Sequence, residues 1–471
     1  MTTRTDTAVA TRNRRWALTG LAVIVLAAAS LEGFVLPALP RLQQDFGVDA
    51  ATGALASVVP TVITVIVTPL AGRLADVYGA GRTLAGLVAI VIAGGLTSAF
   101  APDFTLFIVG QALQGFALGI IPVGFVVLRH LFRAESIKTA SGVLVAMSVA
   151  GAGLGVLTAG PIIEATSRAV LYAVPTGVVA LGALLFFAAR PGLQRRDPDA
   201  PTGVDWLGAG VFAVALVVLV VALASTSSAG WLALPTLVLF AAAVALLAVW
   251  IWIESRVAQP MIDVASLRSR SVGGAVAVGV AIGAGYAPIV FLVPQLIAQP
   301  TETGYGLGAT ASQTGLFLAV AYAAGVVSSV LAGRAARTTG LRPVGVVAMV
   351  ILALGSIVAV LSSASVSLVL MLLLAGVGAA AASTVVYASA AIGAEAHEVG
   401  VSTALITIAR AVGGALATQV VASLITTDGA PAFMTFQVAF GIAAAISLAG
   451  AGVAFWLMPR ERAEVTGGAH F

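Results

Sequence analysis

The segment from Gly72 to Arg82, GRLADVYGAGR, decides the fold of this 471-residue chain. It is short, charged and rich in glycine, and an apolar run long enough to cross a bilayer lies on each side of it. A span needs about 20 apolar residues, and basic residues gather in cytoplasmic loops. The segment therefore predicts a tight cytoplasmic turn between two membrane helices.

The composition of the whole chain agrees with a location in lipid. Hydrophobic residues make up 60% of it and charged residues only 9%, whereas soluble domains carry about 25% charged residues. In lipid, every backbone polar group needs a partner within the protein, so a span is a helix or part of a closed barrel. Because the apolar runs are continuous rather than alternating, we expect an all-α integral membrane protein.

Residues that the sequence lacks exclude several kinds of chemistry. There is no cysteine, which removes disulfides, iron–sulfur clusters and thiolate metal sites. The histidines, His130, His397 and His470, fall in predicted loops or tails, so we expect no metal site and no cofactor. Lys138, the only lysine, lies outside any phosphate-binding glycine loop. The chain therefore carries no P-loop ATPase of its own, and any driven process would run on a gradient or on a separate ATPase subunit.

The basic residues predict the orientation of the chain. We count fourteen candidate spans, from Ala17–Leu39 to Phe433–Leu457. With the N-terminus inside, twenty basic residues fall in cytoplasmic segments and two, Arg41 and Arg168, fall outside. This asymmetry predicts that both termini are cytoplasmic. The net charge of +4 is spread over many short loops and forms no patch, so we expect no nucleic-acid partner.

Several motifs occur in an order that resembles one family of carriers. Residues 72–84 combine glycine, leucine, aspartate and glycine with a basic end, and 333–340 carry a weaker copy. Residues 31–40 (LEGFVLPALP), 113–115 (LQG) and 155–161 (GVLTAGP) fall in the first, fourth and fifth spans. With fourteen spans, these motifs resemble the major facilitator superfamily, and within it the fourteen-span drug:proton antiporters. Internal repeats are expected in such carriers.

The resemblance implies a major facilitator fold, with two six-helix bundles and two inserted helices. It also implies alternating access, and we expect a monomer. The expected boundaries are an N-terminal cytoplasmic tail (1–15), a first bundle (16–190), a linker with two extra spans and an interfacial helix (191–270), a second bundle (271–458) and a C-terminal cytoplasmic tail (459–471).

Glu32 is the candidate for proton coupling. It is the acidic residue well inside a predicted span, about 10 Å from the outer end of the first span at 1.5 Å per residue. An intramembrane carboxylate is costly and is by default a functional hypothesis. Low-dielectric surroundings favour its neutral form, so that a proton gradient can load and unload it. The alternative is a neutral, hydrogen-bonded glutamic acid that only fixes the packing.

Two polar residues in later spans are candidates for the substrate cavity. Gln111 stands where the resemblance implies an arginine. It would donate a neutral hydrogen bond to Glu32 or to substrate, or it would pack between helices. Arg410, near the middle of the thirteenth span, should face a cavity or a partner rather than lipid. It would pair with Glu32 in one state, bind an anionic group on the substrate, or hydrogen-bond backbone carbonyls.

Three weaker cavity candidates come from the ninth and tenth spans. Tyr286 and Gln295 lie on a predicted helix that also holds two prolines, and Tyr322 lies on the next one. Prolines leave backbone groups free within a helix, which favours a kink near a cavity.

The resemblance implies that Asp76 is a conformational latch between the two halves, within a motif that includes Gly72, Gly79 and Arg82. The physical basis would be its carboxylate facing the positive N-terminal end of the thirteenth span. An ordinary solvated loop charge is the alternative.

The fifth span resembles the antiporter-type helix motif. Gly151, Gly155 and Gly160 are spaced for close helix contact, and Pro161 bends the end of the helix. The motif departs from the family pattern at Glu164-Ala165, where two glycines are expected.

These features predict a secondary active transporter rather than an enzyme. We expect it in the inner membrane of a bacterium, where it exports lipophilic small molecules, drugs or natural products in exchange for protons and so confers antibiotic resistance. An apolar cavity with one titratable acid suits amphiphiles better than sugars, which need many polar contacts. A proton-coupled uptake symporter for a small metabolite and a receptor or scaffold on a transporter fold are the alternatives.

Overall fold

The computed structural model describes residues 4–48, 50–189, 203–257, 269, 271–361, 365–395, 398–425 and 432–459. Within these ranges the chain is helical and has no strand. The earlier helices are α1 (Arg4–Gly33), α2 (Val35–Phe46), α3 (Ala50–Tyr78), α4 (Ala80–Phe100), α5 (Phe104–Gln114), the 3₁₀ turn η1 (Ala117–Gly119), α6 (Ile120–Leu131), α7 (Ala134–Ala165) and α8 (Arg168–Ala188). The later ones are α9 (Trp206–Ser228), α10 (Leu234–Glu254), α11 (Val272–Ile297), the 3₁₀ turn η3 (Thr301–Thr303), α12 (Ala311–Thr339), α13 (Leu341–Leu361), α14 (Ser365–Gly393), α15 (Val399–Ile425) and α16 (Phe433–Leu457).

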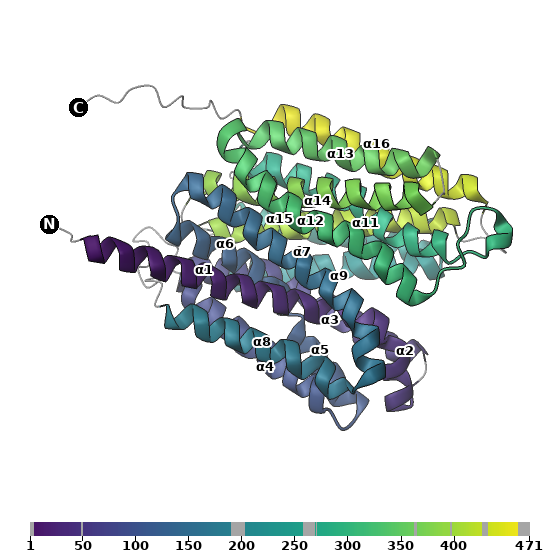
Figure 1. The fold of residues 1–471 in the computed structure, drawn as a ribbon, viewed down its shortest axis with the longest axis horizontal. Helices are drawn as coiled ribbons and strands as arrows, with labels where there is room; N and C mark the ends of the chain where they lie inside the picture. Colours follow the sequence, from purple (N-terminus) through teal and green to yellow (C-terminus); the bar gives the residue numbers. More distant parts are fainter. Residues whose placement is uncertain are drawn as a thin grey trace.

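Fourteen helical segments among the described residues are long and apolar enough to cross a membrane. The expected number of spans and the all-α fold are thus confirmed. Because the number is even, the start of α1 and the end of α16 lie at the same end of the molecule (Figure 1).

The helices form two groups that face each other (Figure 1). In the N-terminal half, α1 packs on α7 and α8, and α4 packs on α5 and α8. In the C-terminal half, α13 packs on α14 and α16, and α11 packs on α15 and α16. The halves meet where α7 packs on α12 and where α3 packs on α15. The domain limits near 190 and 270 stay predictions, because 190–202, 258–268 and 270 lie outside the described residues, as does most of the predicted interfacial helix.

One glycine makes the tight turn in each half. Gly79 links α3 to α4 with φ +92°, and Gly340 links α12 to α13 with φ +89°. Both φ values are positive, in a region that L side chains rarely adopt and glycine adopts readily. The two turns occupy corresponding places in the predicted motif and in its weaker copy, so the internal repeat extends to backbone geometry.

The inserted helices α9 and α10 pack on each other and cover the junction between the halves. Besides its contact with α10, α9 contacts α3 and α15. Phe212 and Trp250, with ring centroids 4.6 Å apart, form a small apolar cluster with Leu216 and with Val401 of α15. The inserted pair therefore touches both halves beside the α3–α15 contact.

The fourth span, expected as one helix over Phe104–Leu128, is interrupted between α5 and α6 by η1. Pro122 lacks the N–H that a continuous helix would need at that position. Thr64 of α3 donates a hydrogen bond of 2.8 Å to the carbonyl of Gly115, just before the interruption. A side-chain hydroxyl thus supplies the hydrogen bond for a backbone carbonyl at the break, as is needed where no water is present.

We predict that Thr64→Val lowers the stability of the folded protein, because it weakens the contact of α3 with this break. The substitution removes the donor to Gly115, and a hydrogen bond between membrane helices contributes about 1 kcal/mol. The melting temperature of the purified protein should fall, while Thr105→Val, at an exposed position of α5, should leave it unchanged. Equal melting temperatures for the two variants would contradict this role for Thr64.

The first span, expected as one helix over Ala17–Leu39, divides at Phe34 into α1 and α2. Pro37 has no N–H to offer the carbonyl of Gly33. Glu32 therefore lies one residue before the end of α1, and the chain continues as a second, shorter helix that packs on α3 and α7.

Candidate transport site

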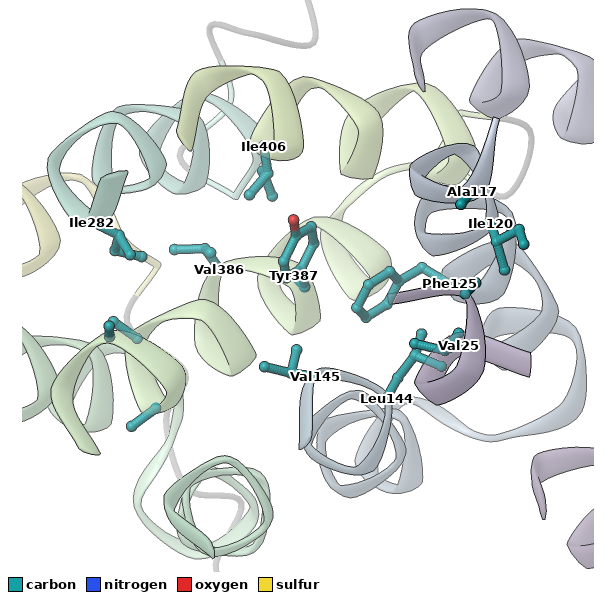
Figure 2. Packing of buried hydrophobic residues seen from close by; sticks show 14 of the residues in the cluster. Val25, Ala117, Ile120, Phe125, Leu144, Val145, Ile282, Val386, Tyr387 and Ile406 are labelled. Atoms are coloured by element: carbon teal, nitrogen blue, oxygen red, sulfur yellow. The ribbon is translucent and has the colours of Figure 1, made fainter. Parts of the chain in front are cut away.

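A cavity of about 260 Å³ lies between the two halves, bordered by α6, α7, α11, α12, α14 and α15. Its walls are mostly apolar, and the polar groups on them are hydroxyls and one guanidinium. Phe125 of α6 and Tyr387 of α14 stack with ring centroids 4.7 Å apart. Figure 2 shows these two rings pointing toward each other, with Val145 of α7 nearby. Residues from both halves therefore meet at this cavity.

Three of the predicted residues lie together on the wall of this central cavity: Arg410, Tyr286 and Tyr322. The Arg410 guanidinium carbon lies 5.9 Å from the centroid of the Tyr387 ring. Its buried Nε donates no hydrogen bond, and the described side chains offer the guanidinium no ion-pair partner. A cation in this setting is available to a ligand.

Two other predicted residues do not line this cavity. Gln111 is 1% exposed, and its Nε2 donates to Ser98 Oγ at 3.0 Å, inside the N-terminal half. Gln114 donates to the same oxygen. Gln111 thus takes part in a buried polar cluster between α4 and α5, which matches its alternative as a packing residue. Gln295 is exposed near the end of α11.

The side chain of Glu32 lies outside the described residues, but the backbone beside it is placed. Gly33 packs against the carbonyl of Ala152 and the Cα of Gly155, both on α7. Ala152 lines the central cavity. The end of α1 that carries Glu32 is therefore next to a residue of the cavity wall.

Asp76 lies against the first turn of α15. Its Oδ1 accepts a hydrogen bond from the N–H of Gly400 at 3.0 Å and its Oδ2 accepts one from Val401 at 3.1 Å. The side chain is 7% exposed. The N–H groups of a first helical turn lack partners within their own helix and carry a partial positive charge. Asp76 thus caps a helix of the other half.

Glycines allow this close approach. A Cβ at Gly72 would overlap the carbonyl of Gly400, and a Cβ at Gly400 would overlap the carbonyl of Gly72. Arg82, the last predicted residue of the motif, is exposed at the start of α4. We call the end of the molecule that holds the Asp76 contact the latch end.

Arg129 makes a second contact between the halves at the latch end. From the last turn of α6 it donates to the carbonyls of Ala391 and Ile392, at 3.3 and 3.2 Å. These carbonyls belong to the last turn of α14, which carries partial negative charge. An anion from the N-terminal half thus holds the start of α15, and a cation holds the end of α14.

Sequence reasoning missed Arg129, Phe125 and Tyr387. Arg129 was counted only among the cytoplasmic charges, since a basic residue at the end of a span is normally solvated. Tyr387 does stand out as the one aromatic residue of a span rich in alanine, glycine and serine. That contrast is a signal that could have drawn attention to it.

The antiporter-type glycines join α7 to α1. A Cβ at Gly151 would overlap the carbonyl of Leu26, and a Cβ at Gly155 would stand 2.9 Å from the Cα of Gly33. Pro161 is exposed within α7, and the surroundings of Gly160 lie outside the described residues. Within the part of the chain that is described, no three His, Asp or Glu side chains gather as a metal site would require.

The model of the Major Facilitator Superfamily matches residues 21–418 and also 274–470 of this chain. The chain belongs to the Major Facilitator Superfamily. It is a multi-pass membrane protein, and the members of this family are transporters rather than enzymes. The second match begins in α11, so the C-terminal half alone also carries the pattern of the superfamily.

Curated superfamily members from bacteria resemble the chain at low identity. Multidrug transporter protein MdtP of Bacillus subtilis is 25% identical over 72% of this chain and 61% of its own length. The uridine/deoxyuridine transporter of Lactococcus lactis is 27% identical over 62% of each. Multidrug resistance protein Stp of Mycobacterium tuberculosis is 25% identical over 86% of this chain and 74% of its own length. The chain thus spans about three-fifths of the first two relatives.

A solved superfamily structure supports the fold. The human organic anion transporter MFSD10 superposes with a TM-score of 0.66 at 14% identity, over 94% of this chain and 99% of its own. At this identity the likeness concerns the fold alone.

Proposed function

We propose that this transporter exports lipophilic small molecules in exchange for protons, by alternating access, from a bacterial cytoplasm across the inner membrane. The observation that carries the proposal is the central cavity, which lies between two halves that meet at the latch end through polar contacts. Contacts of this kind can form and break reversibly, because water satisfies both partners when they separate.

Substrate chemistry follows from the walls of the cavity. They are mainly apolar, with a few hydroxyls and the Arg410 guanidinium. Such a lining favours bulky amphiphiles and disfavours sugars, which need many polar contacts. The names of MdtP and Stp, both multidrug proteins, point the same way.

Proton coupling falls to Glu32 in this proposal. The end of α1 that holds it packs beside Ala152 of the cavity wall, and an acid within the membrane exchanges between neutral and charged forms as the surrounding water changes. The latch end is the cytoplasmic end, in agreement with the distribution of basic residues, and both termini face the cytoplasm.

A second candidate is uptake of a small metabolite together with protons. The uridine/deoxyuridine transporter among the relatives favours it. The same fold would serve both directions, since the direction depends on which state the proton stabilises.

Membrane vesicles separate the two candidates. Drug susceptibility of cells with and without the protein first supplies a substrate from a compound panel. That substrate should then accumulate in inverted vesicles with an acid interior, and dissipation of the pH gradient should abolish the accumulation. Accumulation in right-side-out vesicles with an acid exterior would instead establish uptake. Lack of transport in either orientation for any compound would favour a receptor or scaffold.

A further inference from the structure

A second cavity, of about 550 Å³, lies beside the central one, between α3, α9, α11 and α15. We call it the lateral cavity. One wall belongs to the inserted helix α9, whose apolar side chains face it: Leu216, Leu219, Val220 and Leu223. Its volume falls within the range of about 300–1,000 Å³ that small-molecule sites occupy. The lateral cavity is larger than the central one, and none of the predicted functions required it.

Arg410 borders both cavities. The partition between them continues through a hydrogen bond of 2.9 Å between the Tyr387 hydroxyl, on the central side, and Thr407 Oγ1, on the lateral side. Because no described side chain ion-pairs with Arg410, its charge can serve a ligand on either side. A guanidinium that has no ion-pair partner among the described side chains is costly in the membrane, so an anion on the lateral side would be stabilised strongly.

Several other polar groups of the lateral cavity are already engaged. Thr64 Oγ1 donates to Gly115 and Thr68 Oγ1 donates to the carbonyl of Thr64. Gln419 Nε2 donates to the carbonyl of Leu223 at 2.7 Å, which joins α15 to α9 at the end of the cavity remote from the latch end. This bond closes that end of the cavity, and a volume of about 550 Å³ suits a compact molecule better than a phospholipid with two acyl chains.

We propose that the lateral cavity binds a lipophilic organic anion, with its apolar body against α9 and its anionic group on Arg410. A bound anion pairs with the Arg410 guanidinium and so weakens the interaction of that group with a ligand in the central cavity. The two cavities therefore compete for one cation. The inserted helix α9 supplies the apolar half of this site. The proposal concerns binding and is independent of the direction or energy source of transport.

The test uses a matched pair of probes on the full-length protein in detergent. Anilinonaphthalenesulfonate carries an anionic group, and phenylnaphthylamine has the same aromatic skeleton without it. Equilibrium dialysis against micelle-matched buffer gives the dissociation constant of each. We expect the wild type to bind the sulfonate at least about tenfold more tightly, as one charge-assisted hydrogen bond would provide.

Variants then locate the probe. Val220→Trp and the smaller change Ala415→Leu fill the lateral cavity alone, whereas Ser148→Phe fills the central cavity alone. Arg410→Met removes the charge. Sulfonate binding should weaken about tenfold or more in the two lateral variants and in Arg410→Met, and it should persist in Ser148→Phe. Gel filtration and melting temperature establish that each variant is folded, and Ala415→Leu keeps the test decisive if Val220→Trp misfolds.

Three outcomes overturn the proposal. Loss of sulfonate binding in Ser148→Phe with retention in Ala415→Leu places the anion in the central cavity. Equal binding of both probes, unaffected by Arg410→Met, means that no anionic group is recognised. Phospholipid that copurifies with the wild type and is lost from Ala415→Leu, by mass spectrometry of the extract, means that the occupant is a bilayer lipid. The vesicle test of the proposed function uses the wild-type protein and is therefore decided independently of these outcomes.

Discussion

In Asp76→Ala, the two halves separate at the latch end. The substitution leaves the N–H groups of Gly400 and Val401 without the carboxylate that holds them now. Hydrogen bonds to a charged group contribute about 1.5–3 kcal/mol each, and water that enters the opened end recovers part of this. A net loss of about 2 kcal/mol changes the ratio of closed to open molecules by about 30-fold.

Spin labels measure this separation directly. The chain has no cysteine, so Tyr78→Cys and Thr339→Cys place two nitroxides at exposed helix ends, one in each half. The long-distance population between them should grow from a minor to a major fraction in Asp76→Ala.

Two further variants test the cause. Arg129→Met removes the second contact, between α6 and the end of α14, and should shift the distances in the same direction by less. Asp103→Ala removes a helix cap inside the N-terminal half, where Asp103 Oδ1 accepts from the N–H of Leu106 at 2.8 Å, and should leave the distances unchanged. A distance distribution in Asp76→Ala that equals the wild type would refute the latch.

In Glu32→Gln, efflux driven by a pH gradient falls to the level of vesicles without the protein. Glutamine is similar in size and forms hydrogen bonds, but it takes up and releases no proton, so a proton gradient can no longer bias the two states. Exchange of labelled for unlabelled substrate across the membrane should persist, since it needs no net proton movement. Both rates are measured in proteoliposomes.

Glu302→Gln is the matched control. Glu302 is exposed in η3, so the same chemical change there should leave both rates intact. If Glu32→Gln still pumped against a proton gradient, Glu32 would not be the coupling group. If exchange also stopped, the residue would serve the packing of α1, as its alternative states.

The sequence predicts most of the architecture because the signals are local. Fourteen apolar runs correspond to the fourteen candidate spans of the described residues, and one glycine with positive φ explains each tight turn, at Gly79 and at Gly340. Both breaks within spans lie close to prolines, Pro37 and Pro122, whose positions are visible in the sequence. Their consequence was missed because a proline can also lie within a continuous membrane helix, as Pro288 and Pro294 do in α11.

The cavities could not be predicted in the same way. A span that is hydrophobic on every side has no polar face, so its sequence does not say which residues point toward a cavity. Gln111 was assigned to the substrate cavity because it stands where the resemblance implies an arginine, yet its donation to Ser98 places it within one half. The Asp76 contact was predicted from the family resemblance. The contact of Arg129 with the end of α14 depends on tertiary packing alone.

Alternating access is tested most directly by two nitroxide pairs, one at each end of the otherwise unchanged chain. The first pair is Tyr78→Cys with Thr339→Cys at the latch end. The second is Thr166→Cys with Leu316→Cys at the opposite end, where α7 ends and α12 begins and both positions are exposed. When substrate is added and the pH is lowered, the distance at one end should lengthen as the distance at the other shortens. Distances that stay fixed at both ends, or that lengthen together, would contradict a carrier that opens its central cavity to one side at a time.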